Sequence, residues 1–249
     1  MGINWFEEGV ITAAYPSLLR KLRKCEVRSE YDRGIRPSKV SAERNGIKIP
    51  KQKPGDVFHQ QLFSMLFHAD SGAGTIRAEF SIPTVEFDAR PLTAIADGVG
   101  FEGDTPKRIF EYKSGRGKHV VYPSDHIQPQ AIGLALCLAF SGGDPIENLH
   151  YTLVLADYGC GLCPKVVVRS KKPAYHCDQS ECRDRQKPNN LTAFDFPFRL
   201  NKAEDAVRDE MDFLEGRRVA RGSTSPELCD NCPYRGECPY RMRPPDPSL

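Results

Sequence analysis

The sequence predicts an α/β protein in which helices flank one central sheet. Stretches with helical spacing open the chain, three short strand-like runs follow, and an apolar helix and a further strand come after them. The chain has 249 residues, of which 39% are hydrophobic and 27% are charged. It is therefore long enough to bury a sizeable core and too apolar for a wholly disordered chain.

Each element is predicted from its own local pattern. Some of the expected helices have apolar residues on one face and polar residues on the other, and others are apolar throughout. The last one opens with a capping-box pattern at Asn201–Glu204. The expected strands are apolar runs separated by Gly, Pro and Asp. By residue number, the helices cover 15–30, 55–68, 124–140 and 201–218, and the strands cover 76–82, 94–101, 108–112 and 151–156.

The charge of the chain is unevenly distributed. The net charge is only +2, but residues 1–53 carry twelve basic and six acidic residues. Such a basic end favours a surface that faces phosphates, although a solvated helix face gives the same pattern. The longest apolar run, residues 131–140, is too short to cross a bilayer, and no basic segment followed by an apolar core opens the chain. We therefore expect a cytoplasmic protein with no membrane partner.

Three charged side chains predict a site for a hard cation. On a strand, Glu111 and Lys113 point to one face while Phe110 and Tyr112 point to the other. Asp97 lies on the strand before, and two carboxylates from neighbouring strands can hold Mg²⁺ or Mn²⁺ through oxygen. The lysine beside them can orient or help to deprotonate an attacking water. The alternative is an exposed Glu–Lys pair on an edge strand, which contributes little to the stability of the fold.

A histidine and a glutamine extend this pattern. His59 lies in the apolar stretch 55–68, where it is either a third metal ligand or a core histidine. Gln130 lies in the first turns of the helix that follows Lys113, from which an amide can reach back to the same centre.

The order of these residues resembles the PD-(D/E)XK nuclease superfamily in its RecB-like branch. The resemblance covers about residues 55–140 and implies a restriction-endonuclease-like core, with a central mixed sheet flanked by helices. It implies metal binding by side chains and one main-chain carbonyl, action of Lys113 on the water, and positioning by Gln130 or, failing that, Gln128. The implied metal ligands are His59, Asp97, Glu111 and the carbonyl of Tyr112.

Two positions depart from the family pattern. Asp97 lacks the glycine that usually stands two or three residues ahead of it, and Leu134 stands where relatives commonly have tyrosine. The second departure bears on the role of Gln130 and makes Gln128 its alternative.

Nine cysteines are many for a cytosolic enzyme, and in a reducing compartment they favour metal ligation over disulfides. Three follow the spacing Cys229-x2-Cys232-x5-Cys238, and Cys25 is the candidate fourth ligand. One early cysteine with such a late triplet resembles the iron–sulfur nucleases, including the CRISPR-associated RecB-like exonucleases and AddB-type nuclease domains. The resemblance implies a structural 4Fe–4S cluster that joins the two ends of the chain; zinc at the same thiolates is the alternative.

A second set of cysteines lies between these ends. Its spacing is that of a four-cysteine zinc site, although reduced surface cysteines in a loop are the alternative. The set consists of Cys160, Cys163, Cys177 and Cys182. The remaining cysteine, Cys137, lies in an apolar run and is expected to be a buried small hydrophobe.

These patterns predict four regions: a basic helical segment (1–54), a nuclease core (55–158), a cysteine-rich insertion (159–190) and a C-terminal helical segment (191–249). The predicted function is a Mg²⁺- or Mn²⁺-dependent DNA nuclease. The resemblance implies exonuclease action on single-stranded DNA or DNA ends, with trimming of prespacers for a CRISPR integrase complex as a further implication. The alternatives are a non-catalytic nucleic-acid-binding or protein-docking module and a zinc-ribbon accessory factor.

Overall fold

The computed structural model describes residues 2–33, 74–115, 120–157, 190–223, 226–230 and 232–240. Two predicted features lie outside these ranges. One is the apolar helix 55–68 with His59, and the other is the cysteine-rich insertion with Cys160, Cys163, Cys177 and Cys182.

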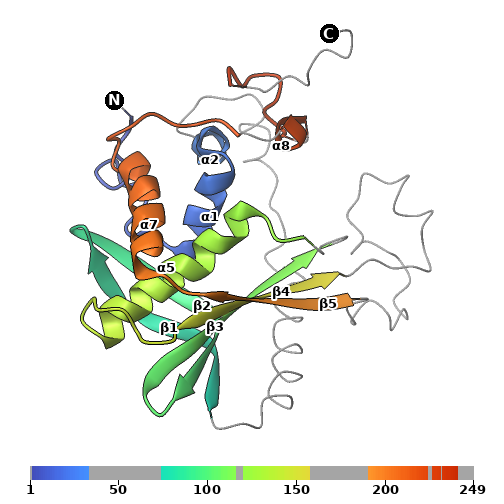
Figure 1. Cartoon of the computed structure of the whole chain (residues 1–249). Helices are drawn as coiled ribbons and strands as arrows, with labels where there is room; N and C mark the ends of the chain where they lie inside the picture. The colour runs from blue at the N-terminus through green and yellow to red at the C-terminus, as the bar shows by residue number, and fades with distance from the viewer. Residues whose placement is uncertain are drawn as a thin grey trace, which may run out of the picture.

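The core is a five-stranded mixed sheet whose strands lie side by side in chain order (Figure 1). All neighbours are antiparallel except β3 and β4, which are parallel. A parallel pair needs a long crossover, and α5 (Pro123–Phe140) supplies it. This arrangement is α/β and is consistent with the predicted restriction-endonuclease-like core. The strands are β1 (Thr75–Phe87), β2 (Arg90–Glu102), β3 (Thr105–Gly115), β4 (His150–Asp157) and β5 (Asn190–Pro197).

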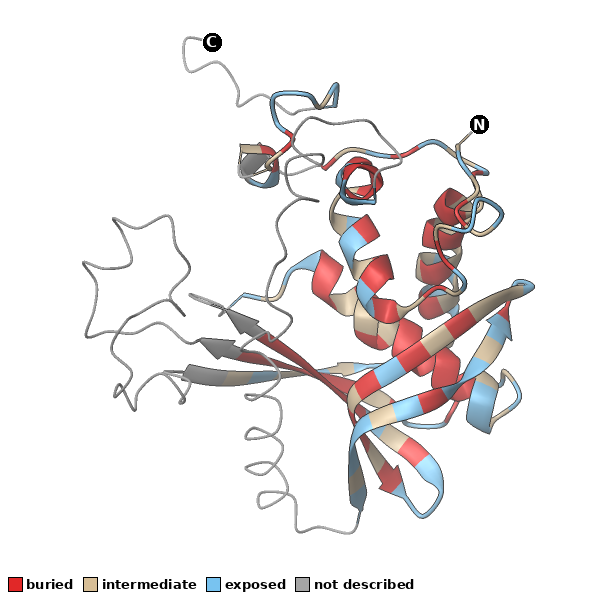
Figure 2. Cartoon of the chain, turned by 180° about the vertical axis from the view of Figure 1, so that it is seen from behind, coloured by how far each residue is buried: buried red, intermediate tan, exposed pale blue. Residues whose placement is uncertain are grey.

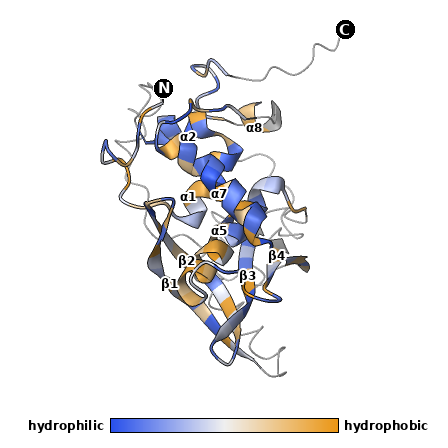
Figure 3. Ribbon diagram, turned by 60° about the vertical axis from the view of Figure 1, so that its left-hand side comes forward, coloured by the Kyte–Doolittle hydropathy of each residue, from blue (hydrophilic) through white to orange (hydrophobic). Residues whose placement is uncertain are grey.

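The helices cover one face of this sheet in two layers. Helix α5 packs on β1, β2 and β3, and α1 (Pro16–Lys24) and α7 (Leu200–Leu214) pack on α5 (Figure 1). Because α5 has neighbours on both sides, its residues from Ala131 to Cys137 are all buried. Buried residues line the helices and the sheet face beneath them (Figure 2), and hydrophobic colour marks α5 while the outer helices show hydrophilic surfaces (Figure 3).

Two local predictions are wrong. The helix expected over 15–30 is two helices, because Cys25 adopts an extended conformation (φ −172°, ψ 107°) between α1 and α2 (Glu26–Asp32). The capping box at Asn201–Glu204 is not formed, since α7 begins one residue earlier, at Leu200, and already ends at Leu214. A short helix, α8 (Pro226–Asp230), follows in the C-terminal segment.

One strand was not predicted, and one cysteine was placed correctly. Strand β5 pairs with β4 and so extends the core sheet into the segment expected to be helical. Cys137 is fully buried, as predicted. Within the described ranges, none of the helices combines the length and the apolar character needed to cross a membrane.

Candidate active site

Strand β3 places Glu111 and Lys113 beneath α5. Their side chains are 1% and 7% exposed, whereas Phe110 and Tyr112 pack with Val154 on the opposite face of the sheet. This is the alternation that the strand pattern predicts. The ammonium of Lys113 contacts Glu111 Oε1, so acid and amine are paired in the interior rather than exposed on an edge.

Helix α5 supplies an amide to the same pair. Lys113 Nζ donates a hydrogen bond of 2.7 Å to Oε1 of Gln128. Gln130 is two residues further along α5, on the other flank of the helix, where it lines a separate cavity. Of the two glutamines considered from the sequence, Gln128 is therefore the one that contacts the lysine.

Asp97 reaches the pair from β2. The register Gly98↔Phe110, continued by one residue, sets Asp97 opposite Glu111. The backbone pairing of the two strands ends at this point, and Asp97 Oδ2 accepts a 2.8 Å hydrogen bond from the N–H of Tyr112. On the other side of Asp97, Glu79 has a left-handed backbone (φ +46°), which marks an irregularity in β1. The two carboxylates thus converge where the ladder is interrupted.

The electrostatics of Glu111 are unusual for a carboxyl group. Burial raises its pKa; the nearby Lys113 ammonium opposes this rise, and the charge of Asp97 reinforces it. Its second oxygen, Oε2, is buried and has no hydrogen-bond partner among the described residues. An unpartnered buried carboxylate oxygen is costly, so Oε2 is an atom that a proton or a bound cation would stabilise.

Arg20 and Asp125 form a supporting ion pair that sequence reasoning missed. Arg20 in α1 donates to Asp125 Oδ1 through Nε (3.1 Å) and Nη2 (2.8 Å), and Asp125 is completely buried. The other oxygen of Asp125 accepts from the N–H of Tyr122 and so caps α5. Arg20 also lowers the pKa of Glu111. Asp125 after Pro123 is a recognisable helix start, but no local signal pairs it with a residue in α1.

The structure brings Asp97, Glu111, Lys113 and the backbone of Tyr112 together, while the position of His59 lies outside the described residues. The buried carboxylate of Glu111, with its unpartnered oxygen, and the partly buried carboxylate of Asp97 are a donor set that suits a hard divalent cation. Within the described part of the chain, no three His, Cys, Asp or Glu side chains are close enough to hold one ion.

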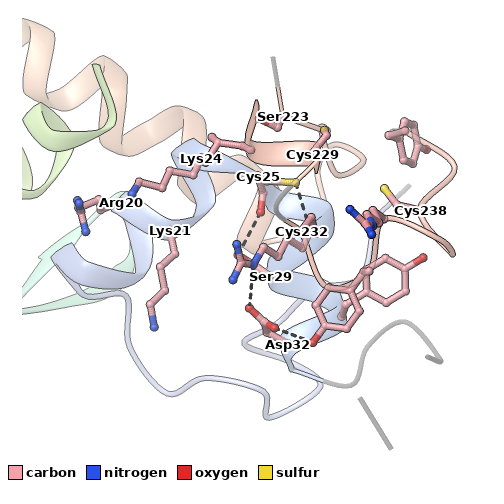
Figure 4. A pocket seen from close by; sticks show the side chains of 16 residues that line it. Arg20, Lys21, Lys24, Cys25, Ser29, Asp32, Ser223, Cys229, Cys232 and Cys238 are labelled. Atoms are coloured by element: carbon pink, nitrogen blue, oxygen red, sulfur yellow. Dashed lines mark hydrogen bonds and ion pairs between the residues drawn. The ribbon is translucent and has the colours of Figure 1, made fainter. Parts of the chain in front are cut away.

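A second cluster joins cysteines from the two ends of the chain. Cys25 at the start of α2, Cys229 in α8, and Cys232 and Cys238 after it all line one cavity of about 290 Å³ (Figure 4). Burial raises the pKa of the Cys25 thiol, whereas the backbone N–H groups of Arg28 and Ser223 lower it. The four thiols therefore share a cavity although Cys25 lies more than 200 residues before the other three in the sequence.

A buried ion network holds the two ends in this arrangement. Glu26, 2% exposed, accepts hydrogen bonds from Arg218 Nη1 (2.7 Å) and Nη2 (2.6 Å). It also accepts from the backbone N–H of Arg221 (2.6 Å). The same carboxylate thus fixes the segment after α7 against the start of α2, directly beside Cys25.

Comparison with known proteins finds similarity in fold. No protein-family model and no curated protein sequence matches this chain. Among solved structures, the crystal structure of SSO0001 matches with a TM-score of 0.50 and 13% identity, over 96% of this chain and 94% of that chain. LHK-Exo in complex with dAMP matches with a TM-score of 0.43 and 14% identity, over 84% and 89%. The alkaline exonuclease LHK-Exo from Laribacter hongkongensis matches with a TM-score of 0.38 and 13% identity, over 84% and 91%.

Proposed function

We propose that this chain is a metal-dependent deoxyribonuclease whose active site is formed by Asp97, Glu111 and Lys113. The observation that carries this proposal is the buried carboxylate of Glu111, with one unpartnered oxygen, between a buried lysine and the partly buried carboxylate of Asp97. Burying an acid and an amine beside a second acid is costly, and such groups with perturbed electrostatics cluster at functional sites.

The donor set suits Mg²⁺ or Mn²⁺ at this point. Asp97 and Glu111 would hold the ion, and the main-chain carbonyl of Tyr112 and His59 are the further ligands that the resemblance implies. When bound, such an ion polarises a phosphodiester and lowers the pKa of a coordinated water.

The residues of the chain itself hold and orient the reacting groups. Lys113 Nζ carries three N–H groups; one faces Glu111, one faces Gln128, and the third has no acceptor among the described residues. That third N–H can donate to the attacking water or to a phosphate oxygen and so stabilise the charge that develops there. Gln128 fixes the direction of the lysine, which makes it a positioning residue.

The substrate we propose is single-stranded DNA or a DNA end, hydrolysed as an exonuclease. The basic N-terminal segment supports this choice because phosphate backbones are attracted to clustered Lys and Arg. Trimming of prespacers together with a CRISPR integrase complex is the finer role implied by the resemblance, and a reconstituted integration assay would test it.

The test is cleavage of single-stranded DNA labelled at either end, with Mg²⁺ and Mn²⁺ compared. Lys113→Ala and Glu111→Gln should lose at least about 100-fold in rate. Lys107→Ala is the matched control, because it removes a partly exposed lysine of the same strand whose ammonium donates a hydrogen bond to the carbonyl of Glu147, away from the site. Unchanged cleavage by Lys113→Ala would refute the catalytic assignment. Binding without cleavage by the wild-type protein would favour the non-catalytic docking module instead.

We also propose a 4Fe–4S cluster in the cysteine cavity. Each thiolate of such a cluster binds a different iron, so the four sulfurs need to surround a volume rather than meet at one point. The cavity shared by Cys25, Cys229, Cys232 and Cys238 has that character. Protein purified without oxygen should be brown and contain about four irons, and Cys25→Ser should lose the colour. A colourless protein that holds only zinc would overturn the cluster, and zinc at Cys160, Cys163, Cys177 and Cys182 would be measured separately in the Cys25→Ser variant.

A further inference from the structure

A second cavity lies on the other flank of α5 from the catalytic residues. It has a volume of about 500 Å³ and opens between α5, α7 and the β4–β5 edge of the sheet. Its volume is that of a small-molecule site. His126 and Gln130 line it from α5, whereas Gln128, which contacts Lys113, points away from it. We refer to it as the α5–α7 cavity.

Three aromatic rings form one wall of this cavity. Tyr151 stacks on Phe196 at 5.3 Å between ring centroids and an interplanar angle of 24°. His126 stands edge-on to Phe196 at 4.8 Å and shares a 2.8 Å hydrogen bond between Nδ1 and the hydroxyl of Tyr151. Burial raises the pKa of Tyr151 to about 12, so the hydroxyl stays protonated near neutral pH. The wall is thus aromatic, with Tyr151 buried and Phe196 only partly buried within it.

The rim carries positive charge that the fold does not neutralise. Arg199 and Lys202 are exposed, and neither forms an ion pair with a carboxylate in the described part of the chain. Arg23 lines the same cavity but is held by Glu210 (3.0 Å) and Asp209 (3.3 Å), so its charge is already used. No acidic residue lines the cavity among those described.

We propose that the α5–α7 cavity binds a nucleotide, with its base against the aromatic wall and its phosphate at Arg199 and Lys202. A flat apolar surface beside two uncompensated cations matches a ligand that is itself flat at one end and anionic at the other. A free anion would gain nothing from the rings, and an apolar ligand would gain nothing from the cations. Arg199 is the N-cap residue of α7, and the start of this helix, with no acid in its first turn, adds to the positive potential there.

The ligand has two sources, a free nucleotide or one nucleotide of a DNA strand. The inference does not depend on cleavage, because the cavity contains none of the proposed catalytic residues. Binding is therefore measured in the presence of EDTA, which removes divalent metal ions and so prevents cleavage by a metal-dependent nuclease. The probes are dGMP, a short single-stranded oligonucleotide and inorganic phosphate.

The decisive variants remove the two halves of the site separately. The double variant Arg199→Ala/Lys202→Ala should weaken dGMP binding at least about tenfold. Phe196→Leu should weaken dGMP binding about fivefold or more and leave phosphate binding unchanged. Arg208→Ala is the control, since it removes one charge from α7 at a residue that pairs with Asp88 outside the cavity. Thermal unfolding checks that every variant is folded.

Each outcome decides the proposal. Weakened dGMP binding in both variants supports it and identifies a free nucleotide as a ligand. Weakened oligonucleotide binding in both variants, without measurable dGMP binding, supports it with the DNA strand as the source. It is overturned if no probe binds the wild-type protein, or if the double variant binds as tightly as the Arg208→Ala control. Loss in the double variant with no effect of Phe196→Leu reduces the cavity to a general anion site and overturns the nucleotide assignment.

Discussion

Replacing Glu26 by Gln should release the C-terminal segment from the N-terminal helices. The substitution keeps the size of the side chain but removes its charge and turns one acceptor oxygen into a donor that faces Arg218. Removing one partner of a buried ion pair costs about 3–5 kcal/mol. Because the side chains of Arg218 and Arg221 are 22% and 52% exposed, water can solvate them in the variant, and we expect about 3 kcal/mol.

The measurement is unfolding by heat and by urea. For a chain of this length, about 3 kcal/mol corresponds to a fall in Tm of about 6–12 °C. The control is Arg28→Ala, which breaks the exposed pair between Arg28 and Asp32 on the same helix and should cost less than about 0.5 kcal/mol. If Glu26→Gln unfolds at the same temperature as this control, the network does not hold the two ends together and our reasoning is wrong.

Three further substitutions test other features. Burial raises the pKa of Glu210 to about 7, so the folded state holds more protons than the unfolded state between about pH 4.5 and 7, and this group lowers stability as pH rises through that window. Urea titrations should show that the free energy of unfolding of the wild type, relative to that of Glu210→Gln, falls as the pH rises through this window. A difference that stays constant with pH would contradict the assignment. Arg20→Ala leaves the buried Asp125 without its ion-pair partner and should cost about 3 kcal/mol in the same assay; a loss below about 0.5 kcal/mol, as for an exposed pair, would show that the pair is dispensable. Gly216→Ala, at φ +71° with its new Cβ 2.7 Å from the carbonyl oxygen of Gly2, should cost about 1–3 kcal/mol, and an unchanged Tm would refute the strain.

The elements that the sequence predicts well are those whose signal is local. Alternation along β3 places Glu111 and Lys113 on one face, and the structure confirms it. The apolar run in α5 predicts a buried helix, and its full burial follows from having the sheet on one side and helices on the other. Both predictions need only the period of the pattern.

The features that were missed depend on contacts between distant residues. Cys25 interrupts a helix that periodicity alone would continue. Its thiol accepts a hydrogen bond from the N–H of Arg28 and so caps α2, and it lines a cavity with cysteines of the C-terminal segment. Strand β5 is a strand because β4 offers it an open edge, which its own sequence does not reveal. Gln128 rather than Gln130 contacts Lys113 because side chains two residues apart point about 200° away from each other around the helix axis. Which of the two faces the sheet depends on how α5 packs.

The contacts between α2 and the C-terminal segment also constrain how the protein is made. Tyr31 donates to the carbonyl of Glu237, and Tyr234 donates to Asp32, each across about two hundred residues of sequence. While the chain emerges from the ribosome, helix α2 lacks these partners until about two hundred further residues have been translated. Such long loops close slowly and leave apolar faces open in the meantime. A chain truncated before residue 218 would therefore contain α2 without its C-terminal partners. We expect such a product to be degraded rather than to accumulate.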